Sequence, residues 1–256
     1  MGWWIVPALL LPLLQSLPAA APAYEVVDVR DGGNIAGRVI FAGNIPSLPP
    51  LFLLKDRELC AAAASPQMLR ISREDRGVKD AVISLEGITR GKAPPSDKPI
   101  LDNRDCVLTP RVLAVMVGTE IVIQNSDPFL HTMRGRLPDF KQAFNLVFPK
   151  GTPAKHQKIR FPGLISVTCD THPHMQAYIL PFDHPYSAVT DAHGRFEISH
   201  IPAGKYLVRA WHEGWNILGY DKDGRPWSDE PHVMTAEVAV RAGEASQVEF
   251  QLSARD

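Results

Sequence analysis

The sequence has little net charge, few cysteines and no long uninterrupted apolar run. Its 27 lysines and arginines nearly balance 28 aspartates and glutamates, for a formal net charge of −1. This balance argues against partners that are bound through strong positive charge, namely nucleic acids and anionic membrane surfaces. No Ser-His-Asp pattern and no pair of carboxylates marks a hydrolytic site. The sequence therefore predicts a protein that is not an enzyme and does not bind nucleic acid.

The first 23 residues lack charged side chains altogether. An apolar run from Trp3 to Leu14 precedes a small-residue tail, in which Ala21 and Ala23 form an Ala-x-Ala cleavage pattern. This predicts a secretory signal peptide over residues 1–23, although the usual Lys or Arg before the apolar run is missing. The run is too short, and too broken by prolines, to span a membrane. We expect a periplasmic or secreted protein without membrane insertion after cleavage.

The rest of the chain has the composition of short strands and many turns. It is rich in valine, isoleucine and threonine, and the whole sequence has 23 prolines and 18 glycines, which favours strands separated by turns. At most one short helix is expected, around Ala61 to Ala64. The length suffices for one large domain or two ordinary ones. The predicted fold class is all-β.

Three cysteines are an odd number for an exported chain, so one is left over if two pair. Cys60 and Cys106 have no ligand-type residues near them in the sequence and could form a disulfide in an oxidising compartment. Cys169 would then be the free thiol. It is either a metal ligand or a buried free cysteine.

Cys169 ends a strand-like run, and His172 and Met175 follow it within one short turn. A soft thiolate, an imidazole and a weak thioether are three of the four ligands of a type 1 copper centre. The second imidazole could come from His131, which follows the strand-like residues 121–125. His174 is an alternative to His172 but suits the loop less well. The sequence thus predicts one copper site with ligands His131, Cys169, His172 and Met175, against the alternative of a sandwich that has lost its metal.

Residues 104–183 resemble a cupredoxin. The similarity lies in Val117 to Asp127, a strand that leads to His131, and in the spacing of Cys169, His172 and Met175, which is similar to the amicyanin-like branch. The resemblance implies a Greek-key sandwich, three equatorial ligands with Met175 as the weak axial one, and a role for Asn125 in pinning the two ligand loops together. His174 departs from the pattern, since an aromatic residue often precedes the methionine.

The flanking residues resemble a carboxypeptidase regulatory-like domain, which is a transthyretin-like β-sandwich. The similarity lies in Gly37-Arg38-Val39, in Ala81 to Leu85, in Thr190 to Phe196 and in Pro202 to Tyr206. We therefore expect a discontinuous outer domain of residues 24–103 and 184–256, with the cupredoxin-like domain of residues 104–183 inserted in it. The combined layout also resembles proteins labelled methylamine utilisation proteins.

The leading functional hypothesis is an exported type 1 copper protein that carries single electrons. His172, at a loop tip, is expected to face solvent with one imidazole edge. Around it, an apolar collar would dock a redox partner near the His172 loop; its expected members are Pro128, Phe129, Leu130, Met133 and Pro173.

Two alternatives remain. The first is a copper carrier or chaperone that exchanges its metal. The second is a non-redox module that binds carbohydrate or protein through Trp211, Trp215 and Trp227. The sequence does not match two other classes of copper protein. A binuclear site needs two cysteines in one loop, and multicopper oxidases need several His-x-His pairs.

Overall fold

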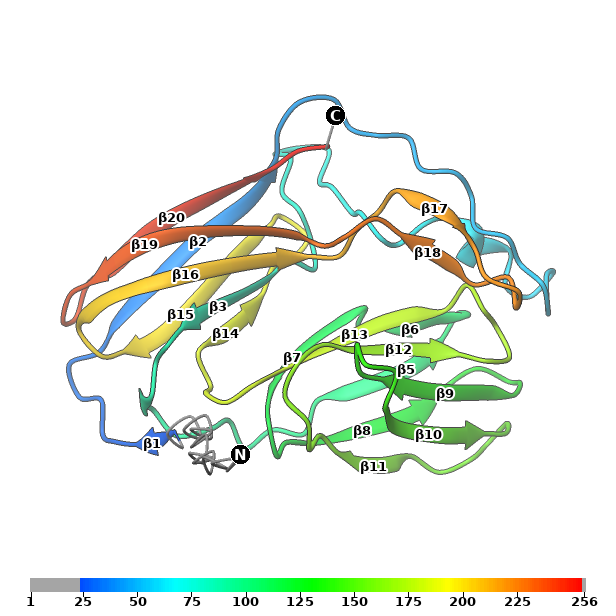
Figure 1. Ribbon diagram of the computed structural model, residues 1–256, viewed down its shortest axis with the longest axis horizontal. Helices are drawn as coiled ribbons and strands as arrows, with labels where there is room; N and C mark the ends of the chain where they lie inside the picture. Colours follow the sequence, from blue (N-terminus) through cyan, green and yellow to red (C-terminus); the bar gives the residue numbers. More distant parts are fainter. Residues whose placement is uncertain (1–23, 255–256) are drawn as a thin grey trace, which may run out of the picture.

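A computed structural model describes residues 24–254, which form two β-sandwiches joined side by side (Figure 1). The predicted signal peptide, residues 1–23, lies outside this described part. Within residues 24–254, no helix has the length and apolarity needed to cross a membrane. The all-β prediction is confirmed, because the described residues fold into strands with one short 3-10 helix, η1 (Ala61–Ala64).

The inner sandwich holds the candidate ligands (lower half of Figure 1). In spatial order, its first sheet comprises β10 (Gln142–Phe148), β9 (His131–Arg136), β12 (Ile165–Cys169), β13 (Gln176–Phe182) and β7 (Val112–Met116). Its second sheet comprises β11 (Lys155–Lys158), β8 (Glu120–Asn125), β5 (Ile100–Arg104) and β6 (Val107–Thr109). Alternate residues of each strand point into one core, as in β12, where Ile165, Val167 and Cys169 are all fully buried.

Two details of the inner sandwich differ from the expectation. Strand β5 straddles the predicted boundary at residues 103/104, yet it pairs in parallel with β8 and so belongs wholly to the inner sandwich. Residues 134–154, whose sequence predicts mainly loop with one short strand, contribute half of β9 and all of β10. On β10, which lies at the edge of its sheet, only Phe144 and Phe148 are buried, and a register shift between Gln142 and Phe144 breaks the regular alternation of inward and outward residues.

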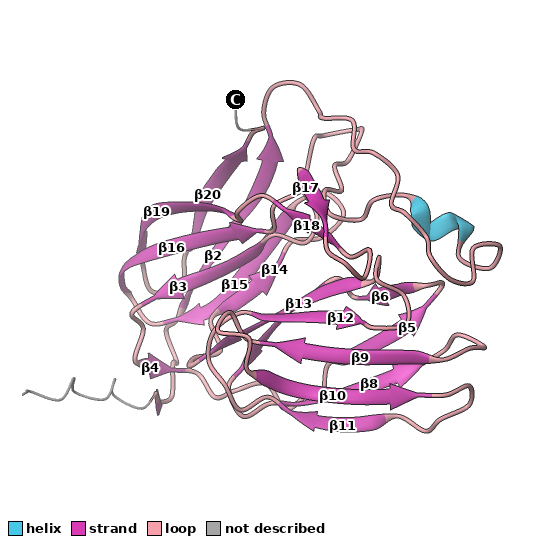
Figure 2. Cartoon of the chain, turned by 45° about the vertical axis from the view of Figure 1, so that its right-hand side comes forward, coloured by secondary structure: helices cyan, strands magenta, loops and turns pink. Residues whose placement is uncertain are grey.

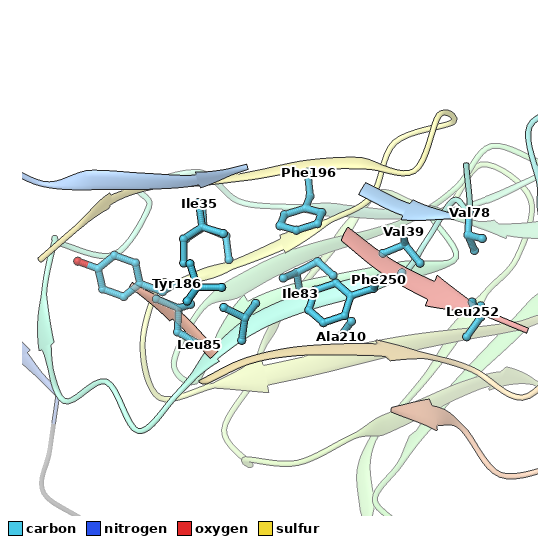
Figure 3. Packing of buried hydrophobic residues seen from close by; sticks show 14 of the residues in the cluster. Ile35, Val39, Val78, Ile83, Leu85, Tyr186, Phe196, Ala210, Phe250 and Leu252 are labelled. Atoms are coloured by element: carbon cyan, nitrogen blue, oxygen red, sulfur yellow. The ribbon is translucent and has the colours of Figure 1, made fainter. Parts of the chain in front are cut away.

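The outer sandwich is built from the two flanks of the chain. One sheet comprises β14 (Ser187–Val189), β3 (Val82–Glu86), β16 (Gly204–His212) and β19 (His232–Val240). The other comprises β15 (Arg195–Ile201), β2 (Gly33–Phe41) and β20 (Ala245–Leu252). Figure 3 shows Ile35, Ile83, Phe196 and Phe250 meeting between these sheets. Gly37 is required on β2, because a Cβ there would lie 1.8 Å from the carbonyl oxygen of Val248.

The two sandwiches meet over a small apolar cluster and one buried ion pair. Val82 and Trp211 of the outer sandwich pack with Val112 and Leu180 of the inner one. Beside them, the Arg111 guanidinium donates to both carboxylate oxygens of Glu213, with 2.7 Å between Nη2 and Oε2. Both side chains are almost fully buried. Since a buried charge is tolerated only when it is paired, this bridge fixes how the sandwiches meet.

Two segments outside the sandwich strands reach over one end of the inner sandwich (Figures 1 and 2). The first, residues 44–68, is the covering segment. It contains η1 and is joined to the inner sandwich by the Cys60–Cys106 disulfide, whose Cα atoms lie 5.4 Å apart. The second is the hairpin of β17 (Ile217–Tyr220) and β18 (Pro226–Ser228). Strands β1 (Glu25–Val26) and β4 (Arg90–Gly91) pair separately. The predicted disulfide is thus present, and Cys169 is the free cysteine.

Candidate metal centre

Three of the predicted ligands come together at the covered end of the inner sandwich. His131 begins β9, Cys169 ends the neighbouring strand β12, and His172 lies in the turn that follows. The Cys169 Sγ lies 3.6 Å from His131 Nδ1 and 3.9 Å from His172 Nδ1. One nitrogen or sulfur atom from each residue lies within 4.8 Å of the others, and all three side chains are fully buried. Two nitrogens and one sulfur therefore converge on one enclosed point.

Backbone hydrogen bonds hold the turn after β12 in shape. The amide of Met175 donates to the carbonyl of His172 at 3.0 Å, and the amide of Cys169 donates to the carbonyl of Met175 at 3.2 Å. The amides of Thr132 and His172 both point at the Cys169 sulfur, at 3.4 Å each. The sulfur thus has two fixed donors before any metal is considered, which stabilises its negative charge.

A carboxylate holds the far nitrogen of each imidazole. His131 Nε2 lies 2.9 Å from Asp127 Oδ2, and His172 Nε2 lies 2.8 Å from Asp56 Oδ2. Asp127 also accepts the amide of Cys106 at 3.0 Å. In the neutral form of each ring, the carboxylate favours the proton on Nε2 and so leaves the lone pair on Nδ1, the atom that faces the sulfur.

The electrostatics of the site favour an ionised sulfur. Burial is the largest single influence on the Cys169 thiol and would raise its pKa, but His131, His172 and the two amides together lower the pKa to about 6. Burial likewise would lower the pKa of His131, yet Asp127 and Cys169 raise it to about 9. At neutral pH the metal-free site therefore holds a thiolate beside a protonated His131. The thiolate is the form in which cysteine binds metals.

Met175 and His174 occupy different positions in the turn. Met175 is buried in the same apolar cluster as Cys169, and its backbone closes the ligand turn. His174 instead directs Nε2 to the carbonyl oxygen of Cys106 at 3.1 Å. It lies outside the converging group of His131, Cys169 and His172. Burial lowers the pKa of His174 to about 4, so its ring is neutral at pH 7.

Asn125 has a narrower role than the resemblance implies. Its Nδ2 donates to the carbonyl of Phe129 at 2.8 Å and to that of Phe148 at 3.1 Å. These bonds fix the loop that leads to His131 and tie it to the end of β10. No side-chain hydrogen bond of Asn125 within the described residues reaches the turn that carries Cys169 and His172. Instead, Asp170 links the two ligand segments, because its amide donates to the carbonyl of Thr132 at 2.9 Å.

The expectation that His172 exposes an imidazole edge is wrong. Its exposed fraction is 0 %, because the covering segment lies over the turn and Asp56 meets its outer nitrogen. The Phe129 ring packs on both ligand imidazoles, with centroid distances of 5.1 Å to His131 and 5.4 Å to His172. Of the expected apolar collar, only Pro128 and Leu130 are exposed; Phe129 is half-buried, and Met133 and Pro173 are buried.

Sequence reasoning missed both carboxylates. Asp127 had a local signal, since it lies four residues before His131 at the end of a strand. Asp56 had none, because it lies 116 residues from His172 and belongs to a different part of the chain. The surroundings of Cys106 were also misjudged: its backbone contacts Asp127 and His174, so the disulfide adjoins the site.

Comparisons with known proteins find partial similarity to solved structures. No family model and no curated protein matches the chain. A purple cupredoxin from Nitrosopumilus maritimus has 20% identity, and the match covers 34% of this chain and 100% of that one, with a TM-score of 0.30. Amicyanin from Paracoccus versutus has 13% identity, with 34% of this chain and 84% of that chain covered and a TM-score of 0.31.

A copper-containing nitrite reductase from Thermus scotoductus SA-01 is also similar, at 22% identity and a TM-score of 0.29. That match covers 36% of this chain and 24% of the reductase, so the chain spans about a quarter of that protein's length. In all three comparisons the likeness takes in about a third of this chain.

Proposed function

We propose that the chain binds one type 1 copper ion through His131, Cys169 and His172, with Met175 as a weak fourth ligand, and carries single electrons between redox partners. The observation that carries this proposal is the buried convergence of two imidazole Nδ1 atoms and one sulfur within 4.8 Å. Two imidazoles and a thiolate with a distant thioether are the ligand set of blue-copper electron-transfer sites.

The chemistry of the donors supports copper over zinc. A structural zinc site is closed by four strong ligands, usually Cys or His. Here the described residues place only three His, Cys, Asp or Glu side chains in the group, and the next candidate is the weak sulfur of Met175. Asp127 and Asp56 lie within hydrogen-bond distance of Nε2 of the two imidazoles, on the side of each ring away from the sulfur. Such outer partners typically orient the rings and raise their basicity.

Electron transfer requires a site that changes little between the two oxidation states. A bound copper ion would supply the one-electron chemistry by alternating between Cu(I) and Cu(II). The chain supplies the rigidity, since His131 and Cys169 lie on adjacent paired strands and His172 lies in a hydrogen-bonded turn. The surrounding core, with Met133, Phe148 and Val167 fully buried, resists rearrangement of the ligands.

We also propose that a redox partner docks near the His172 loop. Because the imidazole of His172 is buried, the partner would contact the covering segment instead. Its large apolar side chains Phe52, Leu54 and Leu59 are 54, 40 and 68% exposed. Since the net charge is only −1, contact between apolar surfaces should matter more than long-range steering.

The two alternative functions are less well supported. A copper carrier must release its metal readily, but these ligands are fully buried beneath a segment that a disulfide anchors. A module that binds its ligand through three tryptophans needs all three at the surface. Trp211 and Trp215 are only 4 and 0% exposed, so of the three only Trp227, at 53%, faces solvent. The disulfide itself favours an oxidising compartment, which supports the proposed periplasmic or secreted location.

The test is the visible absorption spectrum of the purified chain after loading with Cu(II). We expect an intense band from thiolate-to-copper charge transfer, with one copper bound per chain. Cys169→Ser should abolish the band and keep the far-ultraviolet circular dichroism of the parent. A wild-type protein that stays colourless and retains no copper would refute the proposal.

A further inference from the structure

A cleft with surplus positive charge lies beside the candidate metal centre. It has a volume of about 510 Å³ and is enclosed by the covering segment, by β9 and by the turn of the β17–β18 hairpin. Five cationic side chains line it, against three carboxylates; the cations are Lys55, Arg134, Arg136, Lys222 and Arg225. Thr171 and Pro173, which flank His172, form part of its wall. This concentration of positive charge contrasts with the near-neutral chain.

Two of the three carboxylates in the cleft already have strong partners. Asp170 forms ion pairs with both Arg134 and Arg225, the latter at 3.5 Å. Asp221 accepts the backbone amide of Arg225 at 2.9 Å, which closes the turn of the hairpin. Their negative charge is therefore used in holding the walls of the cleft together, and little of it is left to balance the remaining cations.

Lys222 pairs with the third carboxylate, Asp223, at 3.1 Å. Two other cations of the cleft, Arg136 and Lys55, are exposed, and within residues 24–254 neither forms an ion pair or a side-chain hydrogen bond. The Nε of Arg134 is buried and lacks a hydrogen-bond partner. A buried donor left unpaired is costly, and an oxyanion would satisfy it. Guanidinium groups are suited to this, because their paired N–H groups match two oxygens of a carboxylate or phosphate.

A second hollow adjoins the first and is mainly apolar. It has a volume of about 310 Å³ and shares Arg136, Asp221 and Arg225 with the cationic cleft. Leu137, Phe140 and Leu164 line its other side. Phe140 is 82% exposed, so its ring has a free face for a ligand to cover. The two adjoining hollows, called the groove below, therefore offer charge on one side of their shared residues and apolar surface on the other, the pattern of a small-molecule site.

We propose that this groove binds a small organic anion whose oxyanion head meets Arg136 and Lys55 and whose apolar or aromatic body lies against Phe140 and Leu164. The head group would lie against the turn that carries His172. The site is made from three separate parts of the chain, so it exists only in the folded protein. It does not require a bound metal, since none of its cationic side chains is a proposed copper ligand.

Calorimetric titration of the metal-free, full-length protein tests the proposal, with phenyl phosphate, benzoate and inorganic phosphate as probes. We expect phenyl phosphate or benzoate to bind more tightly than inorganic phosphate, and the tighter of the two identifies the head group. Arg136→Gln should weaken that binding about tenfold, the effect of losing one charge-assisted contact. Phe140→Ser should remove the advantage of the aromatic probes over inorganic phosphate.

Arg160→Gln is the matched control, because Arg160 is also exposed but follows β11, whose end pairs with the start of β8, away from the ligand turn. Its affinity should equal that of the wild type. Equal weakening by Arg136→Gln and Arg160→Gln would show non-specific attraction and overturn the proposal. Absence of saturable binding by all three probes would overturn it as well. Because the titration uses metal-free protein, neither result depends on whether the chain binds copper.

Discussion

Removing the Cys60–Cys106 disulfide should both destabilise the chain and open its metal centre. The bond joins residues 46 apart; for a loop of that length, loss of the cross-link lowers the free energy of unfolding by about 4 kcal/mol on the chain-entropy relation. The same bond anchors the turn that carries Asp56, whose carbonyl accepts the amide of Cys60 at 2.8 Å. In the Cys60→Ser/Cys106→Ser double variant, Asp56 should leave His172 more often.

Two measurements on the double variant separate these effects. Urea unfolding should show a free energy of unfolding lower by about 2–4 kcal/mol. Transfer of copper to an excess of chelator should be about tenfold faster, as expected if local opening of the covering segment becomes easier by about 1.4 kcal/mol. Ile83→Ala is the control, because Ile83 is fully buried in the outer sandwich and its truncation costs about 2–5 kcal/mol.

If the double variant loses stability but releases copper at the wild-type rate, the covering segment does not limit escape of the metal, and the prediction is refuted. The prediction is also refuted if Ile83→Ala accelerates copper release as much as the double variant does. That result would mean that copper leaves by global unfolding, whatever covers the site.

Three further predictions concern polar contacts to buried side chains. Asp56→Ala should weaken copper binding about tenfold in a chelator competition, because removing the outer partner of a metal-bound histidine costs at least that much affinity. The control is Asp139→Ala, at an exposed carboxylate, which should leave the affinity unchanged. Burial lowers the pKa of His212 to about 4 from its ordinary 6.5. As the pH falls from 6.5 toward 4, the unfolded chain therefore protonates this histidine before the folded chain does, and the free energy of unfolding should decrease. In His212→Gln, this decrease with falling pH should be smaller. Glu213→Gln should lower the free energy of unfolding by about 3–5 kcal/mol, because it leaves the buried Arg111 charge uncompensated.

The sequence alone was enough for those features that depend on short spacings. The abundance of valine, isoleucine and threonine, together with many prolines and glycines, predicted the all-β class. The odd number of cysteines predicted that one would stay free, and the ligand-type residues beside Cys169 indicated which one. Three predicted ligands converge because each stands at the end of a recognisable strand or in the turn that follows, so adjacent strands were enough to bring them together.

Tertiary structure decided how the metal centre is enclosed. Asp56 reaches His172 across 116 residues of sequence, and nothing in its neighbourhood distinguishes it from other surface aspartates. Burial of His172 likewise depends on the path of a proline-rich segment without regular strands, which the Cys60–Cys106 disulfide joins to the inner sandwich. Spacing along the chain specifies strands and turns because these are local, whereas coverage depends on which separate segments share one end of a sandwich. The sequence alone therefore identified the three converging donors, and only the folded chain showed that they are closed off from solvent.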